Sequence, residues 1–174
     1  IWGYIVKLIQ DNGQPRYGRF DQIPSQINLD DYTYKTPYGD VLTGWRKQLK
    51  YKKFKFCGVQ HAHYSIGVAI VDLSWAGHGF FYVYDHQSGK VVEWNAVQPF
   101  GLKTQLDEQP LFSHSYFKKS GYQFEMQHAN GVRYIQVTKN GDVLLKAHIT
   151  CEGTDPLSMC SPTGINGWTY TQKQ

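Results

Sequence analysis

The fold is decided by residues 122–152, which read YQFEMQHANGVRYIQVTKNGDVLLKAHITCE. Apolar and polar side chains alternate through most of this stretch, as they do in a β-strand that buries one face. Asn130-Gly131 and Asn140-Gly141 interrupt the alternation at the spacing of tight hairpin turns. The stretch therefore predicts three consecutive antiparallel strands, each with one side directed to the interior.

Four segments upstream also have strand composition and short connections: residues 54–60, 64–75, 79–86 and 90–97. The second segment is apolar on both faces, and its smaller side carries Gly and Ala, which predicts that something packs closely against that side. We expect it to be a central strand paired with the segment that follows. No window of comparable length has a clear period of 3.6 residues, so helix is expected to be a minor component.

Two segments, residues 99–110 and 153–167, are predicted to be irregular because of their proline and glycine content. Beyond the second, residues 168–172 again have strand composition, and the chain supplies no later hairpin partner for them. We therefore expect this final run to be covered by further chain, as in the first half of a longer protein.

Composition agrees with a β fold, because aromatic residues make up 16% of the 174 residues. The net charge of +4 is modest, and the basic residues 46–55 are interpreted as a solvated strand face rather than a nucleic-acid contact. Three cysteines without a C-x-x-C pair argue against a disulfide framework. There is no apolar run of membrane-spanning length and no signal-peptide pattern, which favours a cytoplasmic protein without a membrane span.

Three blocks carry a family resemblance: residues 52–59 (KKFKFCGV), 65–77 (SIGVAIVDLSWAG) and 82–89 (YVYDHQSG). In this order they resemble an uncharacterised family, domain-of-unknown-function family 2804, whose opening and ending are similar to residues 8–13 and 156–173. Family members are longer, and their second half carries an Asp-Trp-Gly-Arg-Gly type of motif that is absent here. The resemblance implies that residues 1–174 form a single domain, the N-terminal half of a two-barrel protein.

The family is similar in turn to the lipocalin-like barrels of hydroxyneurosporene synthase and carotenoid hydratase proteins, which act on isoprenoid chains. The resemblance therefore implies an all-β fold, either an antiparallel lipocalin-like barrel or a strongly curved, calycin-like sheet. A shared fold does not fix a shared reaction, so the resemblance supports the architecture more than the chemistry.

The leading hypothesis is that the domain binds or positions a lipophilic small molecule, an isoprenoid or acyl chain, in an aromatic-lined interior. The residues expected to line it are Phe56, Tyr64, Ile66, Val68, Trp75, Phe80, Tyr82, Tyr84, Phe124, Met126 and His128. One alternative is a hydratase- or isomerase-type lyase that a second half completes, with Asp72 or His78 as its acid. Another is a structural domain whose barrel is filled by its own side chains. We expect no cofactor and no nucleic-acid partner.

Cys57, His61 and His63 have the parity of a metal-ligand set on one strand face. No fourth ligand lies nearby in the sequence, so we expect no transition metal and interpret the two histidines as part of a surface turn. Asp85 begins a segment of turn composition, and its carboxylate is interpreted as a turn cap. Asp72 falls on an apolar strand face, where a carboxylate needs a hydrogen-bond or charge partner.

Overall fold

A computed structural model describes residues 6–110, 112–150 and 155–174. Every pairing between its strands is antiparallel. Helix in the described chain is limited to the 3-10 turn Leu29–Asp31 and the short helix α1 (Gly44–Gln48). The prediction of an antiparallel all-β fold with little helix is confirmed.

The first large sheet contains four strands in chain order: β4 (Lys53–Gln60), β5 (Tyr64–Asp72), β6 (Ala76–Asp85) and β7 (Val91–Pro99). As expected, β5 is an interior strand that pairs with β6 along its whole length, from Tyr64↔Asp85 to Asp72↔Gly77. Only three residues join these two strands, which leaves room for a tight turn and nothing else.

The second large sheet has the order β12-β11-β10-β9-β8. Its strands are β8 (Thr104–Gln105), β9 (Ser113–Lys119), β10 (Tyr122–Ala129), β11 (Val132–Lys139) and β12 (Asp142–Thr150). Asn130 and Asn140 adopt positive φ angles of 53° and 51° and form the two predicted hairpin turns with the glycines that follow. A register shift opposite Val137 lets both Leu144 and Leu145 pack against the core.

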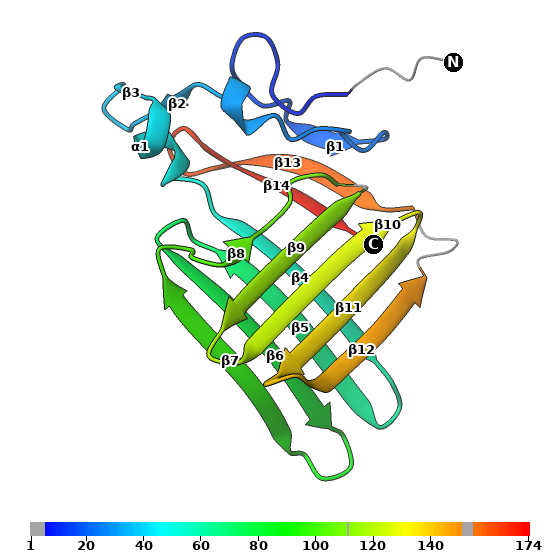
Figure 1. Ribbon diagram of the computed structural model, residues 1–174. Coiled ribbons are helices and arrows are strands. Elements are labelled where there is room, and N and C mark those ends of the chain that lie inside the picture. The colour runs from blue at the N-terminus through cyan, green and yellow to red at the C-terminus, as the bar shows by residue number, and fades with distance from the viewer. Residues whose placement is uncertain (1–5, 111, 151–154) are drawn as a thin grey trace.

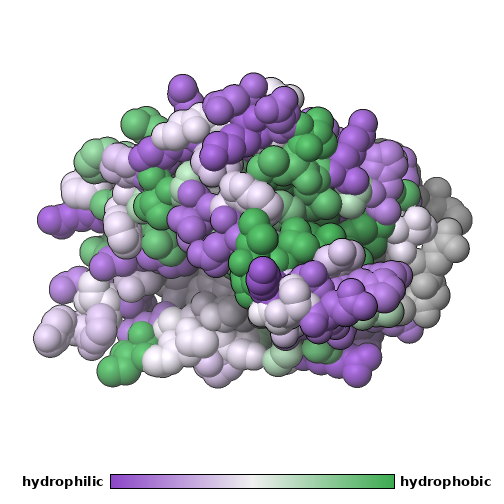
Figure 2. Space-filling view, turned by 90° about the horizontal axis from the view of Figure 1, so that it is seen from below, coloured by the Kyte–Doolittle hydropathy of each residue, from purple (hydrophilic) through white to green (hydrophobic). Residues whose placement is uncertain are grey.

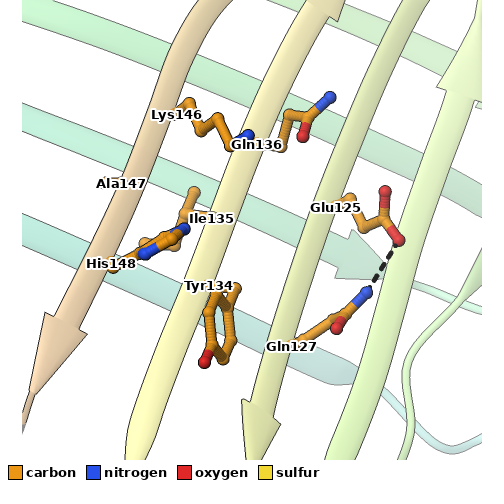
Figure 3. A pocket seen from close by; sticks show the side chains of 8 residues that line it. All are labelled: Glu125, Gln127, Tyr134, Ile135, Gln136, Lys146, Ala147 and His148. Atoms are coloured by element: carbon orange, nitrogen blue, oxygen red, sulfur yellow. Dashed lines mark hydrogen bonds between the residues drawn. The ribbon is translucent and has the colours of Figure 1, made fainter.

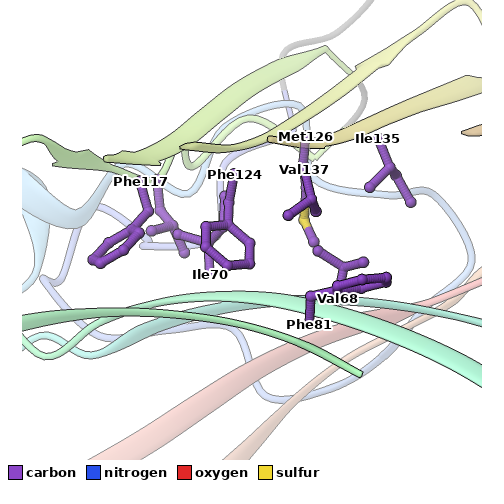
Figure 4. Close-up of a cluster of buried hydrophobic side chains, with 9 residues drawn as sticks. Val68, Ile70, Phe81, Phe117, Phe124, Met126, Ile135 and Val137 are labelled. Atoms are coloured by element: carbon purple, nitrogen blue, oxygen red, sulfur yellow. The ribbon is translucent and has the colours of Figure 1, made fainter. Parts of the chain in front are cut away.

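The two large sheets face each other with their strands crossing, and apolar side chains fill the space between them (Figures 1 and 4). The central members of this core are Val68, Ile70, Phe81, Phe117, Phe124, Ile135 and Val137, each at most 4% exposed. The sheets approach at one corner, where the Gln98 side chain donates to Thr104 Oγ1 at 3.2 Å. The described strands form separate sheets, and no closed barrel is found among them.

A smaller sheet of order β1-β13-β14 lies across one end of the sandwich (Figure 1). Its strands are β1 (Gly18–Phe20), β13 (Leu157–Thr163) and β14 (Gly167–Lys173), and the hairpin β2 (Tyr34–Lys35) and β3 (Val41–Leu42) lies in the same N-terminal part. A second core, built on Leu8, Ile9, Phe20, Ile27, Tyr32 and Cys160, belongs to this part of the molecule.

The prediction that residues 153–167 are irregular is wrong for β13, which lies between β1 and β14. Of the prolines and glycines that motivated the prediction, Pro162 falls within β13, and it lies beyond the residues that pair with β1, namely Ser158 to Cys160. A proline is tolerated at that position because the ladder on that side has already ended. The final run, predicted as a strand at residues 168–172, is β14, and its second edge has no strand partner among the described residues.

We predict that Phe124→Ala lowers the free energy of unfolding by about 3–5 kcal/mol, because it leaves a cavity between the two sheets. Phe54→Ala removes the same side chain from a position that is 61% exposed, and it is expected to cost less than about 1 kcal/mol. Urea denaturation of both variants measures the difference. Equal losses would contradict the assignment of these two residues to an inner and an outer face.

Candidate functional site

The structure distributes the predicted lining residues over two different surfaces. Strand register puts Phe56, Ala69 and Phe80 in one row on one side of the first sheet. Cys57, Val68 and Phe81 form the neighbouring row, which faces the second sheet. Of the predicted residues, those on the inner side are Tyr64, Ile66, Val68, Phe124, Met126 and His128, and those on the outer side are Phe56, Phe80, Tyr82 and Tyr84. Trp75 lies in the β5–β6 turn and is 60% exposed.

The inner surface is filled by the protein's own side chains. Val68 and Phe124 are fully buried in the core, and Met126 is nearly so. The Phe81 and Trp94 rings stack with centroids 4.9 Å apart, and Phe117 meets Phe124 edge to face at 5.8 Å. At the end of the sandwich opposite the small sheet, apolar side chains reach the surface in the middle of the view (Figure 2).

The outer side of the first sheet is an aromatic face. We use this name for Phe54, Phe56, His78, Phe80, Tyr82 and Tyr84. Phe54 and Phe56 are 61% and 45% exposed, and their rings stack with centroids 6.3 Å apart. The Tyr82 ring lies directly over Gly67, where a Cβ atom would come within 2.3 Å of it. The small side of β5 was expected to have a close neighbour. That neighbour is an aromatic ring of β6.

The outer side of the second sheet is polar by comparison. Glu125 accepts hydrogen bonds from His114 at 2.7 Å and from Gln127 at 3.0 Å. Burial raises the pKa of Glu125, but these hydrogen bonds outweigh it, so the pKa lies below its ordinary value. A shallow hollow of about 280 Å³ opens here beside Tyr134 and His148 (Figure 3). This sheet thus has the ordinary pattern of one apolar and one solvated face, and the first sheet does not.

The two residues predicted as possible acids lie on opposite faces of the first sheet. Asp72 pairs with Gly77, and His78 pairs with Val71, one position further along the ladder. Asp72 Oδ1 accepts the Ser74 backbone N–H at 2.7 Å, so the partner that this carboxylate needs is its own turn. His78 belongs to the aromatic face, with its ring 5.6 Å from Phe80, and burial lowers its pKa. The two side chains cannot act on one group together in this arrangement.

The residues considered as metal ligands are also divided. Cys57 faces the interior and packs against the core, whereas His61 and His63 lie exposed at the β4–β5 turn with their rings 5.5 Å apart. Within the described residues, no group of three or more His, Cys, Asp and Glu side chains is arranged to hold a metal ion. Asp85 caps its turn as predicted, accepting the Gln87 backbone N–H at 2.8 Å, and this hydrogen bond lowers its pKa.

A charged cluster that local sequence does not predict lies inside the sandwich, and of its members only His128 is among the predicted lining residues. We call it the Lys55 site: Lys55, Asp107, His128 and Arg133. The alternating lysines of residues 46–55 were interpreted as a solvated strand face, and for β4 this is wrong. Lys55 pairs with Ile70 on the inner side, while Phe54 and Phe56 occupy the exposed side. Among the described side chains, Lys55 Nζ is the one buried nitrogen or oxygen atom without a hydrogen-bond partner.

Burial and the charges around Lys55 together set its pKa. Burial lowers the pKa of Lys55 from 10.5 to about 8; the Asp107 carboxylate raises it and the Arg133 guanidinium lowers it. Burial also lowers the pKa of His128, with Arg133 and Lys55 acting in the same direction and a hydrogen bond to the Pro110 carbonyl opposing them. The site thus brings together three basic side chains and one carboxylate.

The sequence matches the family described as a domain of unknown function, DUF2804, over residues 6–174. The chain belongs to the DUF2804 family. The family predicted from residues 52–89 is therefore confirmed for this DUF2804 chain, whereas its likeness to lipocalin-type barrels stays a prediction. No curated protein and no solved structure matches the sequence. In the described part of the DUF2804 chain, no helix is long and apolar enough to cross a membrane.

We predict that the stability of this DUF2804 chain rises between about pH 8 and pH 10.5 through Lys55. In that window the unfolded state holds a proton on Lys55 that the folded state has released, so raising the pH favours folding. Below pH 8 both states are protonated, and burial of the charge costs roughly 3 kcal/mol. Lys55→Met removes the charge and should remove this part of the pH dependence, measured as the difference between urea-denaturation series of the two proteins. Parallel pH profiles would contradict the burial of Lys55.

Proposed function

We propose that this DUF2804 chain is a binding domain for a lipophilic small molecule of the isoprenoid or acyl-chain class, and that the ligand lies on the aromatic face. The observation that carries the proposal is the exposure of Phe54 and Phe56 toward one end of the face and of Tyr84 toward the other, with Val91 and Val97 also more than half exposed on the same side. So many exposed apolar side chains on one face are unusual for a solvated sheet and are typical of a binding surface.

The chemistry of the aromatic face supports an uncharged, hydrocarbon-rich ligand. Among the residues of β4 to β7 that point to the outer side, Glu93 is the one carboxylate. None of these residues is a lysine or an arginine. The ring of Tyr82 lying over Gly67 gives a smooth surface that suits dispersion contacts along an extended chain. Because the protein's own side chains fill the interior, the ligand is assigned to this outer face. A site on this face requires no closed lipocalin-like barrel.

A second candidate is that another β domain covers the aromatic face, as the second half of a longer chain would. It is favoured by β5, which is apolar on both sides, with Val68 and Ile70 on the inner side and Ala69 and Val71 on the outer side. Strands that are apolar on both sides belong to the middle layer of a layered fold. The hydratase or isomerase alternative needs only one of Asp72 and His78 as its acid, and it stays a prediction.

We predict that Tyr84→Ser and Phe56→Ser each weaken binding of farnesol or dodecanol roughly tenfold, because each removes most of one aromatic contact area. The measurement is displacement of a fluorescent hydrophobic probe by either alcohol. Tyr134→Ser is the matched control, since Tyr134 is 40% exposed on the outer side of the second sheet and Tyr84 is 37% exposed. Binding by the control variant should equal that of the unmodified chain.

The same proteins distinguish the two candidates. If the aromatic face is covered by protein, light scattering will show a self-associated chain that Phe56→Ser converts to monomer, and neither alcohol will displace the probe. Equal displacement from all variants by either alcohol would contradict a ligand site on this face.

A further inference from the structure

The Lys55 site lies on the opposite side of the first sheet from the aromatic face and does not take part in the function proposed above. Two lysines of β4 point to the inner side and differ in one respect. Lys53 forms an ion pair with Glu108, whereas Lys55 Nζ is buried without any hydrogen-bond partner. An ammonium group removed from water without an acceptor is among the least favourable arrangements in a protein interior.

The carboxylate that raises the pKa of Lys55, Asp107, already accepts hydrogen bonds from the backbone. Asp107 Oδ1 accepts the Gln109 backbone N–H at 2.9 Å, and Asp107 Oδ2 accepts the His114 backbone N–H at 3.3 Å. Its negative charge raises the pKa of Lys55, while its oxygen atoms bind the backbone at residues 109 and 114. Asp107 therefore supports the shape of the site, and Lys55 Nζ makes no hydrogen bond to it.

The other groups that face Lys55 add positive charge. Arg133, on β11, donates to the neutral Gln174 side chain at 3.3 Å. The Arg133 charge opposes protonation of both Lys55 and His128, so the three basic groups of β4, β10 and β11 act on one another. Like charges gathered in a partly dry space are stabilised by an anion between them, and guanidinium and ammonium groups are the usual partners of carboxylate and phosphate oxygens.

We propose that the Lys55 site binds a small oxyanion, a carboxylate or phosphate group, between Lys55 Nζ and the Arg133 guanidinium. The anion supplies the acceptor that Lys55 lacks and neutralises the repulsion between Lys55 and Arg133. Because the bound anion favours the protonated amine, binding raises the affinity of Lys55 for its proton. His128 borders the site as a polar neighbour, and the Lys55 charge lowers its pKa.

The experiment is thermal unfolding at pH 7 and constant ionic strength, with sodium acetate, phosphate or chloride as the varied salt. The unfolding temperature of the unmodified chain should rise saturably with acetate or with phosphate, and Lys55→Met and Arg133→Gln should each weaken the apparent affinity roughly 10- to 100-fold. Lys53→Met is the matched control because it removes a paired lysine from the same strand and face, and general salt effects act on it equally.

The separate salts identify the ligand chemistry. A saturable response to acetate alone assigns the site to carboxylates, and a response to phosphate alone assigns it to phosphate groups. An equal response to chloride, or an equal response in Lys55→Met and Lys53→Met, would overturn the proposal. If Lys55→Met folds poorly, the pKa of Lys55 Nζ is measured instead by NMR titration of the unmodified chain. The pKa should rise when acetate or phosphate is present, and an unchanged pKa would also overturn the proposal.

Discussion

The contact of Phe117 and Phe124 with the first sheet holds the two large sheets together, and the other features of the molecule depend on it. It is possible because the facing position on β6 is Gly79, where a Cβ atom would lie 2.7 Å from Phe117 and 2.8 Å from Phe124. The two rings thus pack directly on the backbone of β6, next to Val68 and Phe81. Any side chain at position 79 would have to displace both rings and separate the sheets at the centre of the core.

This packing fixes which side of the first sheet is the inner one. Once Val68 and Phe81 face the second sheet, the pairing of β4 with β5 places Lys55 inside and Phe56 outside. The arrangement is costly on both sides, because it buries an ammonium group and exposes aromatic rings. A simple exchange of the alternating residues of β4 would remove both costs.

The two sheets differ in the character of their faces. The second sheet has the ordinary arrangement of a half-buried antiparallel sheet, with Phe124 and Val137 inside and Glu125 and Gln136 outside. The first sheet carries both candidate sites, one on each face. Its outer aromatic face suits an apolar partner, and its inner face contributes Lys55 to a site for an anion. The two sites are separated by the sheet itself and can be altered independently.

Much of the fold could be predicted from local sequence. The Asn-Gly turns at residues 130–131 and 140–141 and the alternation from Tyr122 onward define β10 to β12, because turn chemistry and period-two alternation act within a hairpin. The same reasoning identified β5 as a central strand and Gly67 as a point of close approach, and the candidate residues Phe56, Phe80, Tyr82 and Tyr84 all lie on the aromatic face.

What only the tertiary structure decided is the direction in which those faces point. An alternating strand such as β4 has two faces by its sequence, but the sequence does not state which one meets the second sheet, and the usual rule of apolar inside fails for Phe54 and Lys55. Strand β13 was missed because the effect of Pro162 depends on where its neighbour β1 ends. The Lys55 site is assembled from β4, β10, β11 and the loop after β8, so its residues share no local pattern. Alternation is a local property of the chain, whereas the choice of the buried face is made by packing between segments far apart in the sequence.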